Sequence, residues 1–296
     1  MSINTLVRCT TVCKYWNSLI KDPTFISTHL KLTTTASSFA VSTTVTAATN
    51  VSRGHEKSFR VADSINGIVC LIGDHDYVPY YYLLWNPSIQ KSITVPRPNL
   101  TSMGHAFVGF GYDSRNDDYK LVRMVPPNDP KGLNSGAQLE IFSLKSSSWK
   151  TLSGPICHKY MTIASSSQAF VNGVVHWIAR RDGDSLLNYV LLGLDMSNEV
   201  LHETILPEEF RIQLLIFVTG NDLKSLHTAR PLWISKKGEE LIAESLDGDL
   251  IAVDLQNRHV KCRQVLGTPE YTFIGPYVES LVLLNTIDGY FVKILE

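Results

Sequence analysis

The chain has 296 residues, of which 44% are hydrophobic and 19% are charged, and its formal net charge at pH 7 is −1. This composition is typical of a folded globular protein and excludes a largely disordered chain. With 27 basic against 28 acidic side chains, the sequence has no positive excess for phosphate contacts, so we expect no nucleic-acid partner.

The sequence predicts neither a signal peptide nor a membrane partner. The N-terminal residues lack a basic start followed by an apolar core, and no apolar run approaches the roughly 20 residues that span a bilayer. The five cysteines form an odd, scattered set, which is typical of a reducing compartment: Cys9, Cys13, Cys70, Cys157 and Cys262. We therefore expect a cytoplasmic or nuclear location, or both.

Residues 6–20 are predicted to form one amphipathic helix. Apolar side chains recur there at spacings of three and four, at Leu6, Cys9, Val12, Cys13, Trp16, Leu19 and Ile20. Asp22 is a candidate N-cap, and Pro23 suits the first position of a second helix that reaches about Leu30. Two small helices cannot bury such a stripe, so it must dock either on the rest of the chain or on another protein.

Residues 33–57 are rich in Ser, Thr and Ala and have no helical stripe, so they are predicted to be a linker or an edge strand. From residue 58 onward the chain alternates short β-like runs with turn signals. A hairpin unit recurs four times, at residues 82–93, 139–152, 190–205 and 250–265.

These units indicate a mainly β fold of the kelch-like β-propeller type. The polar residues that end the first strand of each unit are Asn86, Ser143, Asp195 and Asp254, and they lie 57, 52 and 59 residues apart. Such periods match four-stranded propeller blades, whose kelch-type repeats run near 50 residues, better than an irregular β-sandwich. With four recognisable units, a complete and an incomplete propeller both remain open.

Tight turns support the same reading. Asn66-Gly67 and Asn172-Gly173 each supply the positive φ angles that a two-residue turn needs, and Asp247-Gly248 and Asp288-Gly289 repeat the signal. Among the tryptophans, Trp85, Trp149 and Trp233 are expected to be apolar anchors, and Trp177 to lie in a core between blades.

Residues that could carry chemistry are explained better by packing and turns. Cys9 and Cys13 are four apart on the predicted helix, but no second ligand pair lies near them in sequence. Asp113, Asp117 and Asp118 lack the Gly and Glu of a calcium-binding loop and are predicted to form a polar hairpin loop. The chain also has no phosphate-binding glycine loop. We therefore predict a non-catalytic protein without a cofactor or metal.

Two groups of motifs resemble plant F-box proteins. Residues 12–20, followed by Asp22-Pro23-Thr24-Phe25, resemble the second half of the F-box. The remainder is similar to the F-box-associated, kelch-like domain through motifs at residues 65–71, 84–88, 109–113 and 118–123. Residues 277–284 are similar to the S-locus F-box branch.

The resemblance implies a partial F-box over residues 1–32, a linker over 33–57 and an F-box-associated β-propeller domain over 58–296. It implies a substrate receptor of an SCF-type (cullin-RING) ubiquitin ligase, in which the F-box docks a Skp-type adaptor, and through it a cullin, while the β-domain binds an unknown protein substrate. The implied adaptor contacts are Leu6, Val7, Cys9, Val12, Cys13, Trp16, Leu19 and Ile20.

The family's F-box opens with a Leu-Pro pair and a helix that have no counterpart before Met1-Ser2-Ile3-Asn4, so an N-terminally truncated F-box is expected. The alternative is an adaptor-independent protein-binding propeller, from a truncated or decaying gene copy. Recognition of a target is expected in loops on the rigid scaffold, such as residues 126–134 and 180–185.

Overall fold

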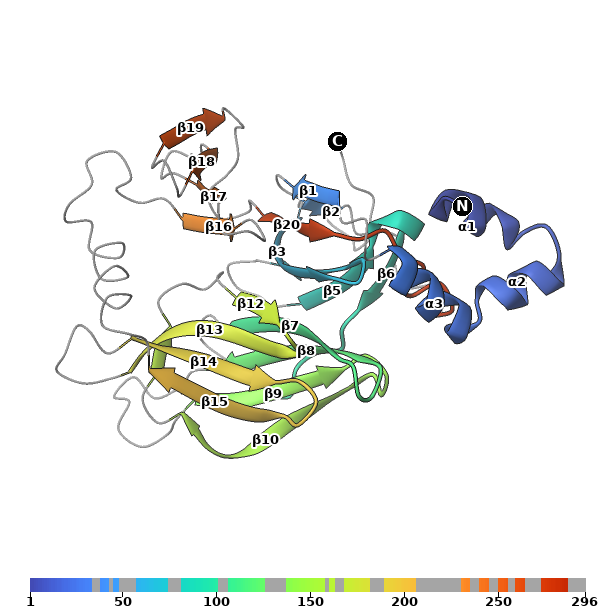
Figure 1. Cartoon of the computed structure of the whole chain (residues 1–296). Helices are drawn as coiled ribbons and strands as arrows, with labels where there is room; N and C mark the ends of the chain where they lie inside the picture. Colours follow the sequence, from blue (N-terminus) through green and yellow to red (C-terminus); the bar gives the residue numbers. More distant parts are fainter. Residues whose placement is uncertain are drawn as a thin grey trace. The chain divides into compact units, whose positions relative to one another are not determined.

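The structure is a computed structural model that describes residues 1–33, 38–42, 45–47, 57–73, 81–100, 106–125, 137–157, 160–162, 168–181, 189–205, 230–234, 240–244, 250–254, 259–263 and 273–286. In these residues three α-helices precede a series of antiparallel β-sheets (Figure 1). The chain divides into two compact units. The first combines Met1–Arg97 with Glu270–Glu296, and the second is Pro98–Pro269.

The first unit begins with three short helices, α1 (Ile3–Cys9), α2 (Lys14–Ile20) and α3 (Pro23–Thr33). The prediction of one helix over residues 6–20 was wrong, because the chain turns between Cys9 and Lys14. The hydroxyls of Thr10 and Thr11 donate to the carbonyls of Val7 and Arg8. These bonds compete with the helical pattern and end α1. None of the described helices is long and apolar enough to cross a bilayer.

The start of α3 confirms the predicted cap. Asp22 Oδ1 accepts hydrogen bonds from the backbone N–H groups of Thr24 (2.8 Å) and Phe25 (3.3 Å), and Pro23 is the first helical residue. These bonds, led by the one from Thr24, lower the pKa of the Asp22 carboxyl. The helix ends at Thr33, about one turn beyond the predicted end at Leu30.

The first unit also holds a five-stranded antiparallel sheet in the order β2-β3-β4-β5-β6. Its strands are β2 (Val45–Ala47), β3 (Lys57–Ile65), β4 (Ile68–Gly73), β5 (Tyr81–Asn86) and β6 (Lys91–Thr94), with a 3₁₀ turn η1 (Pro87–Ile89) between the last two. A separate strand pair joins β1 (Ser38–Ser42) to β20 (Phe273–Tyr277). The segment predicted as a linker over residues 33–57 thus includes β1 and β2.

The second unit contains three further antiparallel sheets. The first sheet has the order β10-β9-β8-β7, made of β7 (Phe107–Asp113), β8 (Asp118–Val125), β9 (Ala137–Ser143) and β10 (Ser148–Cys157). The next has the order β11-β13-β14-β15, with β12 also paired to β13: β11 (Tyr160–Thr162), β12 (Gln168–Val171), β13 (Val174–Arg181), β14 (Tyr189–Asp195) and β15 (Val200–Ile205). The last is β16 (Arg230–Ile234), β17 (Glu240–Glu244), β18 (Leu250–Asp254) and β19 (His259–Arg263).

All four predicted hairpin units are confirmed. They are the antiparallel pairs β5–β6, β9–β10, β14–β15 and β18–β19, each the outer pair of its sheet. The tight turns at Asn66-Gly67 and Asn172-Gly173 also form as predicted, with φ values of 52° and 82° in the first and 52° and 81° in the second. Asp247-Gly248, Asp288-Gly289 and the side chain of Trp233 lie outside the described residues.

A hydrophobic core joins the two successive sheets β7–β10 and β11–β15. Val122 and Leu139 from the first sheet pack in the same cluster as Trp177 and Leu192 from the second. The indole N–H of Trp177 donates to the Val108 carbonyl at 3.2 Å, so the buried ring has its polar partner. The predicted inter-blade position of Trp177 is confirmed. This core fixes the two sheets as consecutive blades.

Candidate functional site: an exposed apolar face on the N-terminal helices

The inner face of the three helices belongs to a hydrophobic core within the first unit. Ile3, Leu6, Ile20 and Ile26 are at most 8% exposed and cluster with Leu281 and Leu284 from near the C-terminal end of the described chain. Val7, Cys9, Phe25, Ile89 and Val282 pack partly against this cluster. With one face, the helices therefore pack against Ile89 of the 3₁₀ turn η1 and against residues 281–284 of their own unit.

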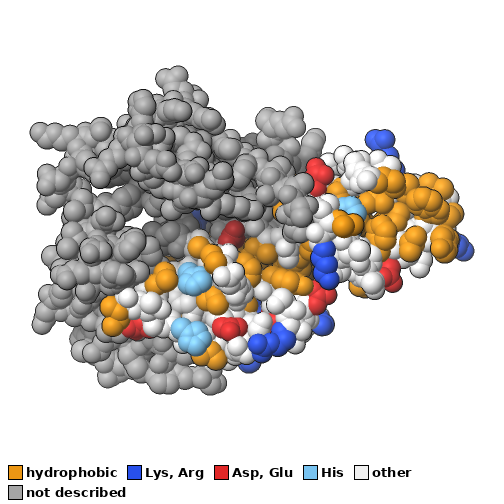
Figure 2. All heavy atoms as spheres, viewed as in Figure 1, with side chains coloured by type: hydrophobic (Ala, Val, Ile, Leu, Met, Phe, Trp, Pro, Cys, Tyr) orange, Lys and Arg blue, Asp and Glu red, His pale blue; other side chains and the backbone are white. Residues whose placement is uncertain are grey.

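The outer face of the helices is also apolar but open to solvent. Trp16 is 42% exposed, Leu19 44%, Val12 70% and Tyr15 72%. Figure 2 shows hydrophobic side chains gathered over this helical part of the molecule, at the right of the view. Single exposed apolar residues are ordinary, but a contiguous group of large ones, two of them aromatic, is typical of an interaction surface. We call Val12, Tyr15, Trp16, Leu19 and Leu32 the helical face.

A groove of about 380 Å³ runs along the helical face. The groove is lined by residues from all three helices and the N-terminus: Met1, Leu6, Trp16, Leu19, Ile20, Phe25, Thr28, His29 and Leu32. Phe25 and His29 stack with their ring centres 6.4 Å apart. Burial of the imidazole lowers the pKa of His29, which favours its neutral form and keeps the groove apolar.

The charges around the helical face are mainly positive. Residues 1–33 contain Arg8, Lys14, Lys21 and Lys31 against a single carboxylate, Asp22. An apolar groove on a segment with a basic excess suits a partner that presents an apolar helix or loop flanked by acidic residues.

The eight residues predicted to contact an adaptor separate into three groups. Leu6 and Ile20 belong to the core, at 5% and 1% exposure, and they also line the groove. Val7 and Cys9 are half-buried against the same core. Val12, Cys13, Trp16 and Leu19 are exposed.

The prediction missed Tyr15 because it treated residues 6–20 as one helix, and it missed Phe25 and Leu32 because it placed no contact on the second predicted helix. In α2 taken alone, Tyr15 and Leu19 are four residues apart and Trp16 and Leu19 are three apart, which places them together. The break at Thr10 and Thr11 changes which side chains share a face.

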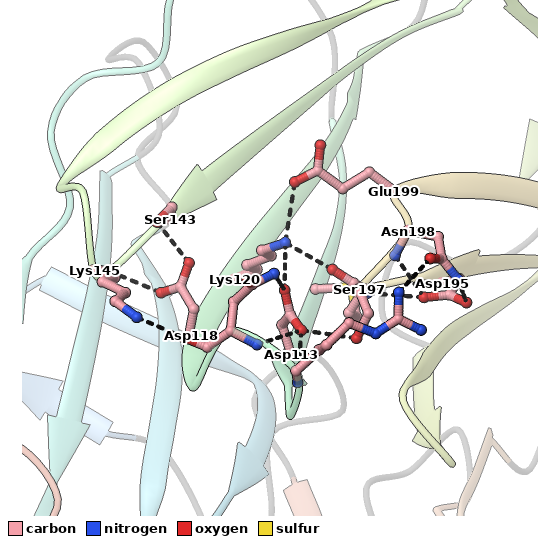
Figure 3. Close-up of polar contacts among 12 residues, drawn as sticks. Asp113, Asp118, Lys120, Ser143, Lys145, Asp195, Ser197, Asn198 and Glu199 are labelled. Atoms are coloured by element: carbon pink, nitrogen blue, oxygen red, sulfur yellow. Dashed lines mark hydrogen bonds and ion pairs between the residues drawn. The ribbon is translucent and has the colours of Figure 1, made fainter.

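A second cluster of polar side chains lies in the second unit, at the turns that join β7 to β8 and β14 to β15 (Figure 3). Lys120 Nζ lies 2.9 Å from Asp113 Oδ2 and 3.0 Å from Glu199 Oε1, and it donates to the Met196 carbonyl at 2.7 Å. Ser197 Oγ donates to Asp113 Oδ1 at 2.7 Å. The cluster therefore connects two blades through charged and polar contacts.

The cluster keeps its groups charged. Burial alone would raise the pKa of Asp113, but hydrogen bonds from Asn116, Lys120 and Ser197 outweigh it and hold that pKa well below its ordinary value. Burial likewise opposes the charge of Lys120, yet its bonds to Asp113 and Glu199 raise its pKa. Because each charge has an opposite charge beside it inside the cluster, we infer that the cluster holds the two blades together. Asp113, Asp117 and Asp118 indeed flank the β7–β8 hairpin turn, as predicted.

Within the described ranges, no group of His, Cys, Asp or Glu is arranged to hold a metal ion. Most of the loops predicted to recognise a target, residues 126–134 and 182–185, lie outside the described residues.

Comparison with known proteins relates the chain to a plant family. The family model of the F-box associated beta propeller domain matches residues 12–240. The chain is 30% identical over 241 residues to F-box protein CPR1 of Arabidopsis thaliana, a match that covers 70% of this chain and 55% of the relative. It is 23% identical to F-box/kelch-repeat protein At3g23880 of the same plant, covering 69% of this chain and 61% of the relative. F-box protein At4g22390 is 26% identical, with 71% and 59% covered.

Among solved structures, the β-propeller domain of Cps50 (Swd1) from Myceliophteria thermophila matches 76% of this chain and 60% of that chain at 13% identity, with a TM-score of 0.30. The chain spans between about half and three fifths of the length of the curated relatives above. Since the family model covers most of the chain and the sheets have the predicted blade arrangement, the chain belongs to the family of plant proteins that carry an F-box associated β-propeller domain.

Proposed function

We propose that this protein is a substrate-recognition subunit of an SCF-type (cullin-RING) ubiquitin ligase. In this role the helical face docks a Skp-type adaptor, and through it a cullin, while the β-propeller domain binds the target protein. The protein performs no covalent chemistry itself. It raises the effective concentration of a target lysine near a ubiquitin-charged enzyme, which is a positioning mechanism.

The observation that supports the adaptor role is the exposed apolar helical face attached to a propeller of this family. Trp16 and Leu19 leave large apolar areas in water, and aromatic residues of this kind are typical centres of binding energy. The excess of basic over acidic side chains in residues 1–33 supports an acidic partner surface.

Co-purification of the full chain with a Skp-type adaptor tests this proposal. We expect stable binding for the wild type and a loss of at least tenfold in affinity for Trp16→Ala. Val200→Ala is the matched control, because Val200 is an equally exposed apolar residue (47%) on β15 of the second unit. No adaptor binding by the wild type, or equal binding by Trp16→Ala, would overturn the adaptor role.

The second candidate is a protein-binding propeller that works without an adaptor. It is favoured by the burial of Leu6 and Ile20, because two residues of the predicted adaptor surface are committed to the chain's own core. In that case affinity capture with the full chain would recover a target protein but no adaptor or cullin, and Trp16→Ala would leave target capture unchanged.

Two finer assignments belong to the same proposal. The similarity of residues 277–284 to the S-locus F-box branch supports membership of that branch, and a phylogenetic tree that groups the chain with other F-box proteins would contradict it.

A cytoplasmic or nuclear location is supported by the scattered cysteines, of which Cys9, Cys13 and Cys70 are free thiols. Imaging of a fluorescent fusion in plant cells tests this location.

A further inference from the structure

Residues 277–286 form a segment that lies against the β2–β6 sheet and the helices of its own unit. We call this segment the strap. Its first residue, Tyr277, places its hydroxyl 2.5 Å from Ser88 Oγ. Further along, Leu281 and Leu284 enter the core beneath the helices. The strap therefore touches the turn after β5 at one end and the helices at the other.

Asn86, the last residue of β5, holds the strap directly. Its Nδ2 donates to the carbonyls of Ser280 (3.0 Å) and Val282 (2.8 Å), and it also reaches Ser280 Oγ at 3.2 Å. Its Oδ1 accepts from Ser88 N at 3.0 Å and shapes the turn η1. Asn86 is completely buried, so these bonds form in a low dielectric environment.

The residue that follows this strand makes a different contact in the β7–β10 and β11–β15 sheets, the two other sheets whose side chains the structure describes. There the residue after the strand donates its backbone N–H to the neighbouring strand pair: Leu144 to the Tyr119 carbonyl at 2.9 Å, and Met196 to the Gly173 carbonyl at 3.0 Å. In the β2–β6 sheet this residue is Pro87, which has no N–H. The dipeptide Asn86-Pro87 thus removes the internal bond and directs a side-chain amide to the strap.

Two more features tie the strap in place. Lys91 Nζ donates to the carbonyls of Leu284 (3.3 Å) and Thr286 (3.0 Å). Leu283 adopts a φ of 75°, a conformation that is costly for a bulky residue and persists only where the surroundings fix it. The backbone of the strap is therefore held on both sides of Leu281 and Leu284, the residues that support the helices.

We propose that Asn86 is a positioning residue for the helical face. By its hydrogen bonds to the strap, it keeps α1, α2 and α3 ordered on the unit that contains the β2–β6 sheet. The chain of contacts runs from Asn86 to Ser280 and Val282, then to Leu281 and Leu284, and from these to Leu6 and Ile20. The consequence for adaptor affinity rests on the function proposed above, whereas the ordering of the helices does not.

Two glycines provide a matched test. Gly67 and Gly173 occupy equivalent tight turns with nearly the same positive φ, 82° and 81°. A Cβ at Gly67 would lie 2.5 Å from the Val278 carbonyl oxygen and would also collide with Ser280, both in the strap, whereas a Cβ at Gly173 meets no described atom within 4 Å. Gly67→Ala should therefore displace the strap, and Gly173→Ala should carry the same backbone strain without touching it.

The measurement is native-state hydrogen exchange of the whole chain, with the amides of β8 and β9 as the internal reference. We expect Gly67→Ala to speed exchange in residues 3–33 at least tenfold, and Gly173→Ala to change it less than twofold. Asn86→Asp gives the second arm, since it keeps the acceptor for Ser88 N but loses the donor to the strap. Its control is the mirror-image change Asp195→Asn at the equivalent end of β14.

Helix exchange that stays within twofold of wild type in both Gly67→Ala and Asn86→Asp would overturn the proposal, as would an equal rise in Gly173→Ala. Should these two variants also unfold the β8–β9 reference, Lys91→Met replaces them, because it removes the ammonium contacts with Leu284 and Thr286. For that variant, a rise of at least threefold in the exchange rate of residues 3–33 supports the ordering of the helices by the strap, and a smaller rise contradicts it. Adaptor affinity is measured in parallel: if the wild type does not bind an adaptor, the function above fails while the exchange result still decides the role of Asn86.

Discussion

The ammonium of Lys120 on β8 lies 2.9 Å from the carboxylate of Asp113 at the end of β7, and both side chains are almost completely buried. Glu199, from the turn after β14 in the next blade, lies on the other side of Lys120 at 3.0 Å. One cation thus joins two blades.

Replacing Lys120 with Met should destabilise the second unit by about 3 to 5 kcal/mol, because the buried Asp113 carboxylate loses its counter-charge. Urea unfolding followed through the fluorescence of Trp149 and Trp177 measures the loss. Lys145→Met is the control: Lys145 is exposed, and its removal should change the free energy of unfolding by less than about 0.5 kcal/mol. Equal effects of the two changes would refute the central role of Lys120.

The same cluster predicts how stability depends on pH. The pKa values of Asp113, Asp195 and Glu199 are lowered in the folded state, so their contribution is present above the unfolded values near 4 and is lost as the pH falls through the lower folded values. The pKa of Lys120 is raised, so its contribution is present below about pH 10.4 and is lost as the pH rises through the folded value.

We therefore expect the urea midpoint of the second unit to be nearly constant between about pH 5 and pH 10 and to fall on both sides. In Lys120→Met both falls should become shallower, because Asp113 and Glu199 lose the cation that lowers their pKa values. A midpoint that rises between pH 5 and pH 3 would contradict the assignment.

Arg123 and Glu140 form a second buried ion pair, on the adjacent strands β8 and β9. Arg123→Met should cost about 3 to 5 kcal/mol, since it removes one partner of a buried ion pair. The double variant Arg123→Met/Glu140→Gln should recover part of that loss. A double-mutant cycle in urea measures the coupling, which we expect to exceed about 1.5 kcal/mol. Simple additivity would show that the two side chains do not stabilise each other.

Substitutions of Leu6 and Leu19 test the stability of the helices and the binding of an adaptor independently. Leu6 is 5% exposed in the core, so Leu6→Ala should lower the free energy of opening α1 to α3 by about 2 to 5 kcal/mol. Leu19 is 44% exposed, and Leu19→Ala should change that free energy by less than about 0.5 kcal/mol while weakening adaptor binding. Hydrogen exchange and a binding titration measure the two quantities. A stability loss in Leu19→Ala as large as that in Leu6→Ala would place both residues in one core.

The β-part of the fold could be predicted from the sequence because its signals are local. Asn66-Gly67 and Asn172-Gly173 specify tight turns by themselves, and the alternation around Asn86, Asp195 and Asp254 marks hairpins at a regular period. The inter-blade position of Trp177 followed from its place in such a strand.

The helical part was harder to predict because competing signals overlap there. The apolar spacing continues through residues 10–13, whereas the hydroxyls of Thr10 and Thr11 end the first helix. The strap could not be predicted at all, because Asn86 and Ser280 are 194 residues apart and neither has a local pattern that indicates the other. As a result, the sequence predicted equal exposure for Leu6, Ile20 and Trp16, whereas the fold buries Leu6 and Ile20 in the core and leaves Trp16 42% exposed.

The strap also affects the order in which the protein can fold during synthesis. Leu6 and Ile20 leave the ribosome early, but Leu281 and Leu284, which complete their core, are made among the last residues described. At ordinary translation rates the interval is tens of seconds, during which the apolar sides of α1 and α2 both face water. The nascent protein therefore exposes more hydrophobic surface at its N-terminal end than the finished one, and this end is where chaperones would be needed most.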